Sequence, residues 1–191
     1  DDPRFGNQSE WKVAMKDAPA VAGNLMCWTC FCQPCALYDL RKKALGGTLE
    51  NYKCCQGYIW PMSSRAGKCG ESSSPEFCLC LEVCCCEGCS ISATRMLIQD
   101  NKNIRSDPCD NRIIRFQNWL QLLNCVCQIA AALTDQAWLD NAADIIQCIA
   151  FLVNCTVMGC MGAQMYYELD DSKGPYAGPG NSAPGIQDMK S

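Results

Sequence analysis

The sequence predicts a mainly α protein, in which a small, metal-stabilised, loop-rich α+β region rich in cysteine is followed by an antiparallel hairpin of two long helices. Two observations support this prediction. Thirteen of the 19 cysteines lie between Cys27 and Cys89, and the stretch after Asp107 repeats apolar residues at helical spacing. With 191 residues, the chain is long enough for one domain or two small ones.

Composition excludes several classes of protein. The net charge is -4 and no long run of Lys or Arg occurs, so the basic footprint of a nucleic-acid binder is missing. The chain has no histidine, which removes the commonest general base and every Cys–His or Ser–His dyad. We therefore expect a protein that is not an enzyme and does not bind nucleic acid.

Residues 1–20 are predicted to form an extended N-terminal segment. They are polar and mixed in charge, unlike a secretory signal or a transit peptide. This favours an intracellular location, cytoplasmic or peripherally membrane-associated, where disulfide scaffolds are rare. The rest of the chain is expected to divide into a cysteine-rich domain (21–106), a helical hairpin (107–170) and a Gly/Pro-rich tail (171–191).

The cysteine-rich domain contains an internal repeat. "CFCQPCALYDLRKKAL" and "CCCEGCSISATRMLIQ" each begin with C-x-C-x-x-C and continue into a helix-competent stretch. A shift of 54 positions superposes four pairs of identical residues. These pairs are Cys30 with Cys84, Cys32 with Cys86, Cys35 with Cys89, and Arg41 with Arg95.

Between the two copies the chain is rich in turn-forming residues. Gly46-Gly47 and Pro61 interrupt regular structure, and Tyr58-Ile59-Trp60 has the composition of a short strand. We expect small β-ribbons and loops arranged around metal.

The helical hairpin begins at Asp107 and Pro108, which form a good N-cap and N1 pair. Thr134-Asp135 can cap a second helix that runs to about residue 169. The apolar run from Ile145 to Met161 approaches the length of a membrane span, but Gln147, Asn154 and Thr156 interrupt it. Packing within protein or at an interface is favoured, and a membrane remains open.

The cysteine spacing predicts zinc bound by four thiolates, because Cys-x-x-Cys lets two thiolates hold one ion and no histidine is present. Disulfides and S-acylation remain alternatives for the same cluster. Cys85 is interpreted as apolar filling, and Cys125, Cys127, Cys148, Cys155 and Cys160 as helix-core residues. The predicted ligands are Cys27, Cys30, Cys32, Cys35, Cys54, Cys55, Cys69, Cys84, Cys86 and Cys89.

"CWTCFCQPCALYDLRKKALGG", together with the later "CCCEGCSISATRMLIQDN", resembles the placenta-specific-8 cysteine-rich family, which includes plant cell-number regulators and cadmium-resistance proteins. Cys27-Trp28, four further residues and Gln33-Pro34-Cys35 fill the frame of the family motif C-[C or L]-x4-C-P-C. Trp28 and Gln33 depart from that motif, and the helical hairpin lies outside the usual domain. The resemblance implies a small, often membrane-associated and self-associating protein linked to divalent metals.

The function predicted first is a non-enzymatic, zinc-stabilised structural or interaction protein, a subunit of a larger assembly that binds protein partners, with self-association open. The alternative is a membrane-associated protein of divalent-metal transport or tolerance. A secreted, disulfide-rich protein is the second alternative.

Overall fold

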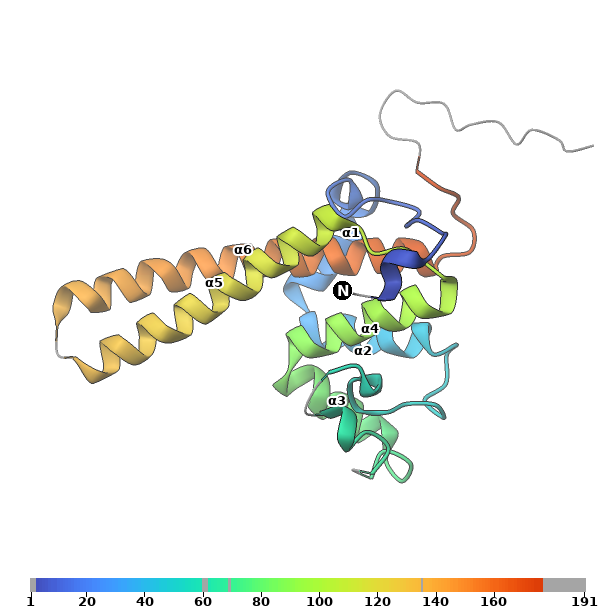
Figure 1. Cartoon of the computed structure of the whole chain (residues 1–191), viewed down its shortest axis with the longest axis horizontal. Coiled ribbons are helices and arrows are strands. Elements are labelled where there is room, and N and C mark those ends of the chain that lie inside the picture. Colours follow the sequence, from blue (N-terminus) through green and yellow to red (C-terminus); the bar gives the residue numbers. More distant parts are fainter. Residues whose placement is uncertain (1–2, 60–61, 69, 135, 177–191) are drawn as a thin grey trace, which may run out of the picture.

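The computed structural model describes residues 3–59, 62–68, 70–134 and 136–176, and this part of the chain is mainly helical. A body of packed helices carries one long arm (Figure 1). The described helices are α1 (Ala18–Phe31), α2 (Gln33–Ala44), α3 (Pro75–Cys85), α4 (Glu87–Lys102), α5 (Pro108–Leu133) and α6 (Ala137–Leu169), with 3-10 turns η1 (Pro3–Gly6), η2 (Cys54–Gly57) and η3 (Met62–Ser64).

The expected β content is wrong for the residues that the structure describes, which contain no strand. An isolated bridge between Ser9 and Ile104 is the one β-type contact there. The segment before Tyr58 cannot extend, because Cys55 and Gln56 have φ values of 46° and 48° and Gly57 follows with 73°. Trp60, the end of the predicted strand, lies outside the described residues.

The chain ends differ from the expected extended segments where the structure describes them. Pro3–Gly6 forms a 3-10 turn, and Val13 and Met15 are buried in the core. The predicted tail is described as far as Tyr176, whose backbone N–H donates to the Lys12 carbonyl at 2.7 Å. The remainder of the tail, residues 177–191, lies outside the described residues.

The two copies of C-x-C-x-x-C form two bent helix pairs of the same design. α1 ends and α2 begins at Cys32, where φ is -132° and ψ is 57°. α3 ends and α4 begins at Cys86, where φ is -140° and ψ is 56°. The central cysteine of each copy therefore makes the bend, at positions that the 54-residue shift superposes.

The helices after the bends bury equivalent faces. α2 buries five positions, and the residues 54 positions later in α4 are buried too. Leu37 corresponds to Ile91 and Arg41 to Arg95, so both an apolar contact and a buried cation recur. The full pairs are Ala36 with Ser90, Leu37 with Ile91, Leu40 with Thr94, Arg41 with Arg95, and Ala44 with Ile98.

Arg41 is a fully buried cation at the centre of the first three-helix contact. Its Nη2 donates to Glu82 Oε1 on α3 at 2.9 Å and to the Ser90 carbonyl on α4 at 2.9 Å. Its Nε donates to Thr94 Oγ1 at 2.8 Å. The Tyr52 hydroxyl donates to the second oxygen of Glu82 at 2.9 Å. One ion pair thus joins α2, α3, α4 and the loop after α2.

Arg95, the counterpart of Arg41 in the second copy, joins α4 to α5 and α6. Its Nη2 donates to Asp110 Oδ2 on α5 at 2.6 Å, and its Nη1 donates to Gln164 on α6. The guanidinium lies 4.5 Å from the centre of the Trp11 ring. Gln164 in turn donates to the Val13 carbonyl at 2.9 Å. Arg95 therefore attaches α5, α6 and the N-terminal segment to the helix pairs.

α6 contacts α1 through two glycines, against which the side chains of Met26, Thr29 and Cys30 of α1 lie directly. A Cβ added at Gly162 would lie 2.8 Å from Thr29 Cβ, and one added at Gly159 would lie 3.0 Å from Met26 Cγ. Such close approach is what small residues at a helix–helix contact permit. The contact fixes the C-terminal half of α6 to the body.

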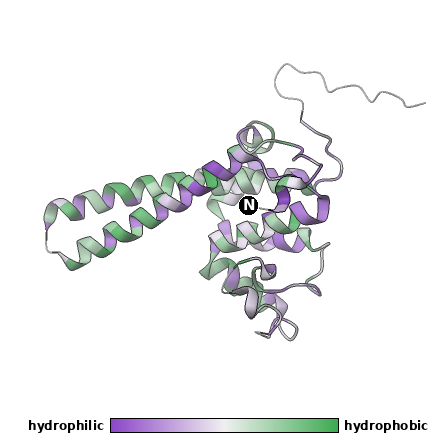
Figure 2. Ribbon diagram, viewed as in Figure 1, coloured by the Kyte–Doolittle hydropathy of each residue, from purple (hydrophilic) through white to green (hydrophobic). Residues whose placement is uncertain are grey.

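α5 and α6 leave the body side by side as a long projection (Figure 1). We call residues 116–134 and 136–155 the arm. Contrary to the expected core packing of this region, Phe116 and Val126 are 60% and 55% exposed, and Cys125 and Cys148 are exposed as well. Figure 2 shows apolar residues along both helices of the arm.

Removing one partner of the Arg41–Glu82 pair is predicted to destabilise the body strongly. Both side chains are buried, so Glu82→Gln or Arg41→Met leaves a group without its compensating charge. We expect the free energy of unfolding, measured in urea by circular dichroism, to fall by about 3–5 kcal/mol. Glu10→Gln breaks an exposed pair with Arg105 and should cost less than about 1 kcal/mol. Equal losses would contradict the central role of Arg41.

The Gly162→Ala substitution is predicted to weaken the α1–α6 contact, because the new methyl group meets Thr29. We expect a loss of about 1–3 kcal/mol in unfolding free energy. Gly88→Ala on α4 is the matched control, since an added Cβ there meets nothing within 4 Å. That control should be neutral or stabilising by up to about 1 kcal/mol. Thermal unfolding of the two variants side by side decides the outcome.

Candidate metal centre

A cavity of about 250 Å³ beside the second bend is lined mainly by thiols and carboxylates. It is formed where η2 meets α3, so residues far apart in the sequence share it. The lining residues are Cys54, Glu71, Cys78, Leu81, Glu82, Cys85 and Cys86. We call it the thiol cavity.

Cys54, Cys55 and Glu82 form the tightest group of metal-ligating atoms in the described part of the chain. Their thiol sulfurs and a carboxylate oxygen all lie within 4.8 Å of one another. The left-handed backbone at Cys55 places its N–H against Glu82 Oε2 at 2.7 Å. Cys54 N–H donates to Glu71 Oε1 at 2.9 Å. Two buried carboxylates therefore fix the backbone of the two adjacent cysteines, of which Cys54 lines the cavity.

Cys86 and Cys89 bring a second pair of thiols to the same bend. Burial, followed by the nearby Cys86 and Glu82, raises the pKa of Cys89. Burial, followed by Glu82 and Cys54, likewise raises the pKa of Cys55, and Cys89 adds to this effect. Cys55 and Cys89 are consequently protonated thiols at neutral pH, and a metal ion that bound them would displace their protons.

The donor set at this bend fits a soft divalent metal. Glu82 is not a free ligand, because its two oxygens accept from Arg41, Tyr52 and the Cys55 N–H. Thiolates suit zinc and other thiophilic ions. Cys54 and Cys55 are the predicted ligands in this group, and the predicted ligands Cys86 and Cys89 lie at the same bend.

The other predicted ligands do not join this group. Cys32 and Cys35 meet at the first bend, where hydrogen bonding with Cys32 is the main cause that raises the pKa of Cys35. Cys84 is exposed on α3, where desolvation and the neighbouring Cys80 raise its pKa. The first bend thus carries a separate thiol pair, with Cys80 and Cys84 on the facing helix α3.

Cys27 and Cys30 lie on α1 and are directed to another part of the molecule. The Cys30 thiol donates to the Cys155 carbonyl of α6 at 3.1 Å, and Cys27 is exposed. Burial, followed by Cys155 and Cys27, raises the pKa of Cys30. Cys30 is therefore part of the α1–α6 contact. Cys69, the remaining predicted ligand, lies outside the described residues.

Five lining residues of the thiol cavity, Glu71, Cys78, Leu81, Glu82 and Cys85, were not among the predicted ligands. Cys85, interpreted as buried filling, is exposed and lines the cavity, and Cys78 lines it as well. The spacing of Cys78 and Cys85 from Glu82 is the sequence pattern that could have identified these two cysteines. Positions 78, 82 and 85 are four and three residues apart, so they share one face of α3.

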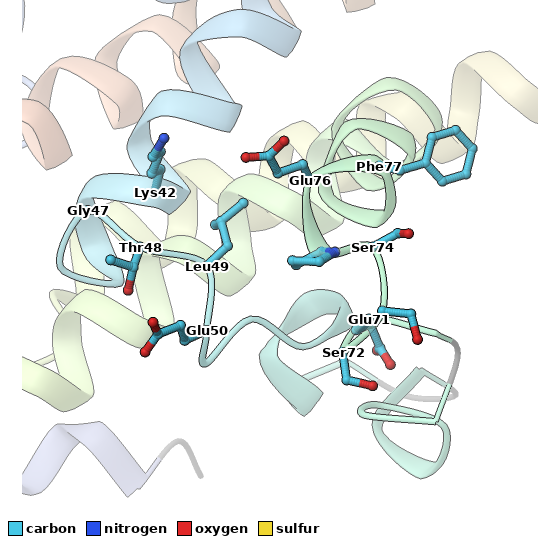
Figure 3. A pocket seen from close by; sticks show the side chains of 12 residues that line it. Lys42, Gly47, Thr48, Leu49, Glu50, Glu71, Ser72, Ser74, Glu76 and Phe77 are labelled. Atoms are coloured by element: carbon cyan, nitrogen blue, oxygen red, sulfur yellow. The ribbon is translucent and has the colours of Figure 1, made fainter.

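A larger groove of about 640 Å³ lies between the loop after α2 and the start of α3. Figure 3 shows the loop from Gly47 to Glu50 on one side and the segment from Ser72 to Phe77 on the other, with the Phe77 ring directed away. The described lining is mostly hydroxyl and carboxylate side chains, with no cysteine. Buried Glu71 is shared with the thiol cavity, so the two spaces are neighbours.

Comparison with protein-family models, with curated proteins and with solved structures gives no match. The resemblance to the cysteine-rich family stays a prediction from the cysteine pattern.

The rate at which a cysteine is alkylated is predicted to depend on the burial and the pKa of its thiol. The thiolate is the reactive form, and the raised pKa keeps Cys55 protonated at pH 8. We expect iodoacetamide to modify Cys55 at least about tenfold more slowly than exposed Cys109, as read from peptide mass spectrometry. Raising the pH should narrow this difference. Equal rates at pH 8 would contradict the buried setting of Cys55.

Proposed function

We propose that this chain is a non-enzymatic structural protein whose body is stabilised by zinc bound to thiols at the second bend. The observation that carries the proposal is the close grouping of the Cys54 and Cys55 thiols with Glu82, beside the α3–α4 bend to which Cys86 and Cys89 belong. Zinc held by four thiolates would join η2 to this bend, in addition to the Glu82 contacts.

A role without catalysis is supported by the chemistry of the sequence. The chain has no histidine, so a bound zinc would have four thiolate ligands. Structural zinc sites are closed in this way, whereas catalytic zinc keeps one position open for water or substrate. A closed thiolate site contributes to folding rather than to a reaction.

A place in a larger assembly is the second part of the proposal. Trp28 and Phe77 are large apolar side chains exposed on the body, at 44% and 68%. Exposed apolar groups of this size mark interaction surfaces in proteins. Protein partners, among them a second copy of the chain, would cover such groups.

Metal content is the direct test of this function. We expect native mass spectrometry of the full chain purified without chelator to show about one zinc ion attributable to this bend. The Cys54→Ser/Cys86→Ser double variant should lose that ion and unfold more readily. Because the bound thiols must give up protons, the zinc affinity should rise with pH.

The matched control replaces two exposed thiols that lie away from the bend. Cys109→Ser/Cys125→Ser removes the same number of sulfurs and should keep the zinc ion. Equal zinc content in both double variants, or a native chain without zinc that binds none on titration, would contradict the proposal.

A further inference from the structure

The amide side chains of α5 form a stripe that faces α6. Gln117 Nε2 donates to Asn154 Oδ1 at 2.6 Å. Gln121 Nε2 donates to the Ala150 carbonyl at 3.3 Å. Further along, Gln128 Nε2 donates to Gln147 Oε1 at 3.1 Å. We call these contacts the amide seam, and its side chains are Gln117, Gln121, Gln128, Gln147 and Asn154.

The sides of the arm that point away from the amide seam are apolar. Trp119 and Leu133 on α5 are 71% and 81% exposed, and Trp138 and Ile145 on α6 are 68% and 62% exposed. Helices of a water-soluble protein turn their apolar face inward and their polar face outward. The arm has the reverse arrangement, with amide side chains between its helices and large apolar side chains exposed. The other exposed apolar side chains of the arm are Phe116, Leu122, Leu123, Val126, Ile129, Ile149, Phe151 and Leu152.

Charged side chains lie near the two ends of the arm. Arg112 and Arg115 lie where α5 leaves the body, and Asp140 and Asp144 lie near the start of α6. Within the arm, the uncharged stretch of α6 runs from residue 145 to residue 155, about 17 Å at the rise of an α-helix, because most of the residues that follow are buried in the body. The hydrocarbon core of a bilayer is about 30 Å thick.

α6 is long and apolar enough to cross a membrane, with a mean hydropathy of 1.8 over its most apolar window. Only 33% of that window is buried inside the molecule. The core helix of a soluble protein would be mostly buried. The apolar half of α6 that forms the arm is therefore available to an external apolar phase.

The edge of the body beside the arm is also apolar. In Figure 1 the bends after α1 and α3 both lie on the side of the body from which the arm projects. Phe31, the last residue of α1, is 90% exposed, and Leu81 of α3 is 54% exposed. A flat apolar phase that received the arm end-on would meet this edge too.

We propose that the arm inserts end-on into a lipid bilayer. Acyl chains cover the apolar outer sides of α5 and α6, while the amide seam bonds Gln117, Gln121 and Gln128 of α5 to α6. Phe31, at the edge of the body beside the arm, enters the near leaflet. The inference does not depend on zinc.

Lipid explains the arm better than a second copy of the chain. The amide seam fixes which side of each helix faces the other. Trp119 and Ile145 each lie about half a turn from that side, so they point in opposite directions. One partner arm would cover one of these surfaces and leave the other in water, whereas acyl chains surround both.

The native thiols of the arm test this insertion without any substitution. Cys125 and Cys148 are exposed on the arm, and Cys109 is exposed at the body end of α5. The full chain is treated with a membrane-impermeant maleimide, with and without phosphatidylcholine vesicles, and labelling is read by peptide mass spectrometry. Vesicles should reduce labelling of Cys125 and Cys148 at least tenfold and leave Cys109 unchanged.

A charge placed on the apolar side of the arm tests the same proposal by binding. Val126→Asp puts a carboxylate on the outer side of α5, and vesicle flotation of this variant should be about a hundredfold weaker. Phe5→Asp adds the same charge at an exposed apolar residue of η1 and should float like the native chain. Unchanged circular dichroism shows that both variants fold.

Three results would overturn the proposal. Equal labelling of Cys125 and Cys148 with and without vesicles would show that the arm does not enter the bilayer. Equal flotation of the Val126→Asp and Phe5→Asp variants would show that the arm does not carry the binding. Protection of Cys125 without lipid, growing with protein concentration, would assign the arm to a second copy of the chain.

Discussion

The Arg41–Glu82 ion pair is the interaction on which the body of this protein depends. Two opposite charges taken out of water are tolerated only when each also finds hydrogen-bond partners, and here Ser90, Thr94 and Tyr52 provide them. Since these groups come from different elements, the pair forms only when α2, α3 and α4 have reached their places. Such a network specifies one arrangement more strictly than apolar contacts do.

The fold was partly predictable from the sequence, at positions where a residue has a specific structural role. A helix beginning at Pro108 follows from the Asp107 cap, whose side chain accepts from the Cys109 N–H at 2.6 Å. The repeat could be read from Arg41 and Arg95, because a buried cation is a rare and demanding feature. The strand predicted at Tyr58 failed because left-handed backbone at Cys55 and Gln56, which no local pattern announces, turns the chain instead.

The sequence predicted which type of residue forms the candidate metal centre, but not which of the cysteines lie together. Spacing indicates which cysteines lie on one turn, as for Cys86 and Cys89, but not which distant turn they meet. That meeting is set by Glu82 and Glu71, which bind the N–H groups of Cys55 and Cys54. Carboxylates that act through backbone hydrogen bonds leave no spacing signature. Cys30 has the spacing of a metal ligand, but its thiol donates to the Cys155 carbonyl of α6.

α6 runs without a break from the tip of the arm to the centre of the body. It is therefore a rigid lever about 50 Å long, and the glycine contact with α1 is its fulcrum. Because the Thr29 side chain lies directly against Gly162, a tilt of the arm would displace the last turn of α1, which leads into the bend at Cys32. A force applied at the tip of the arm would thus displace the cysteines at the first bend.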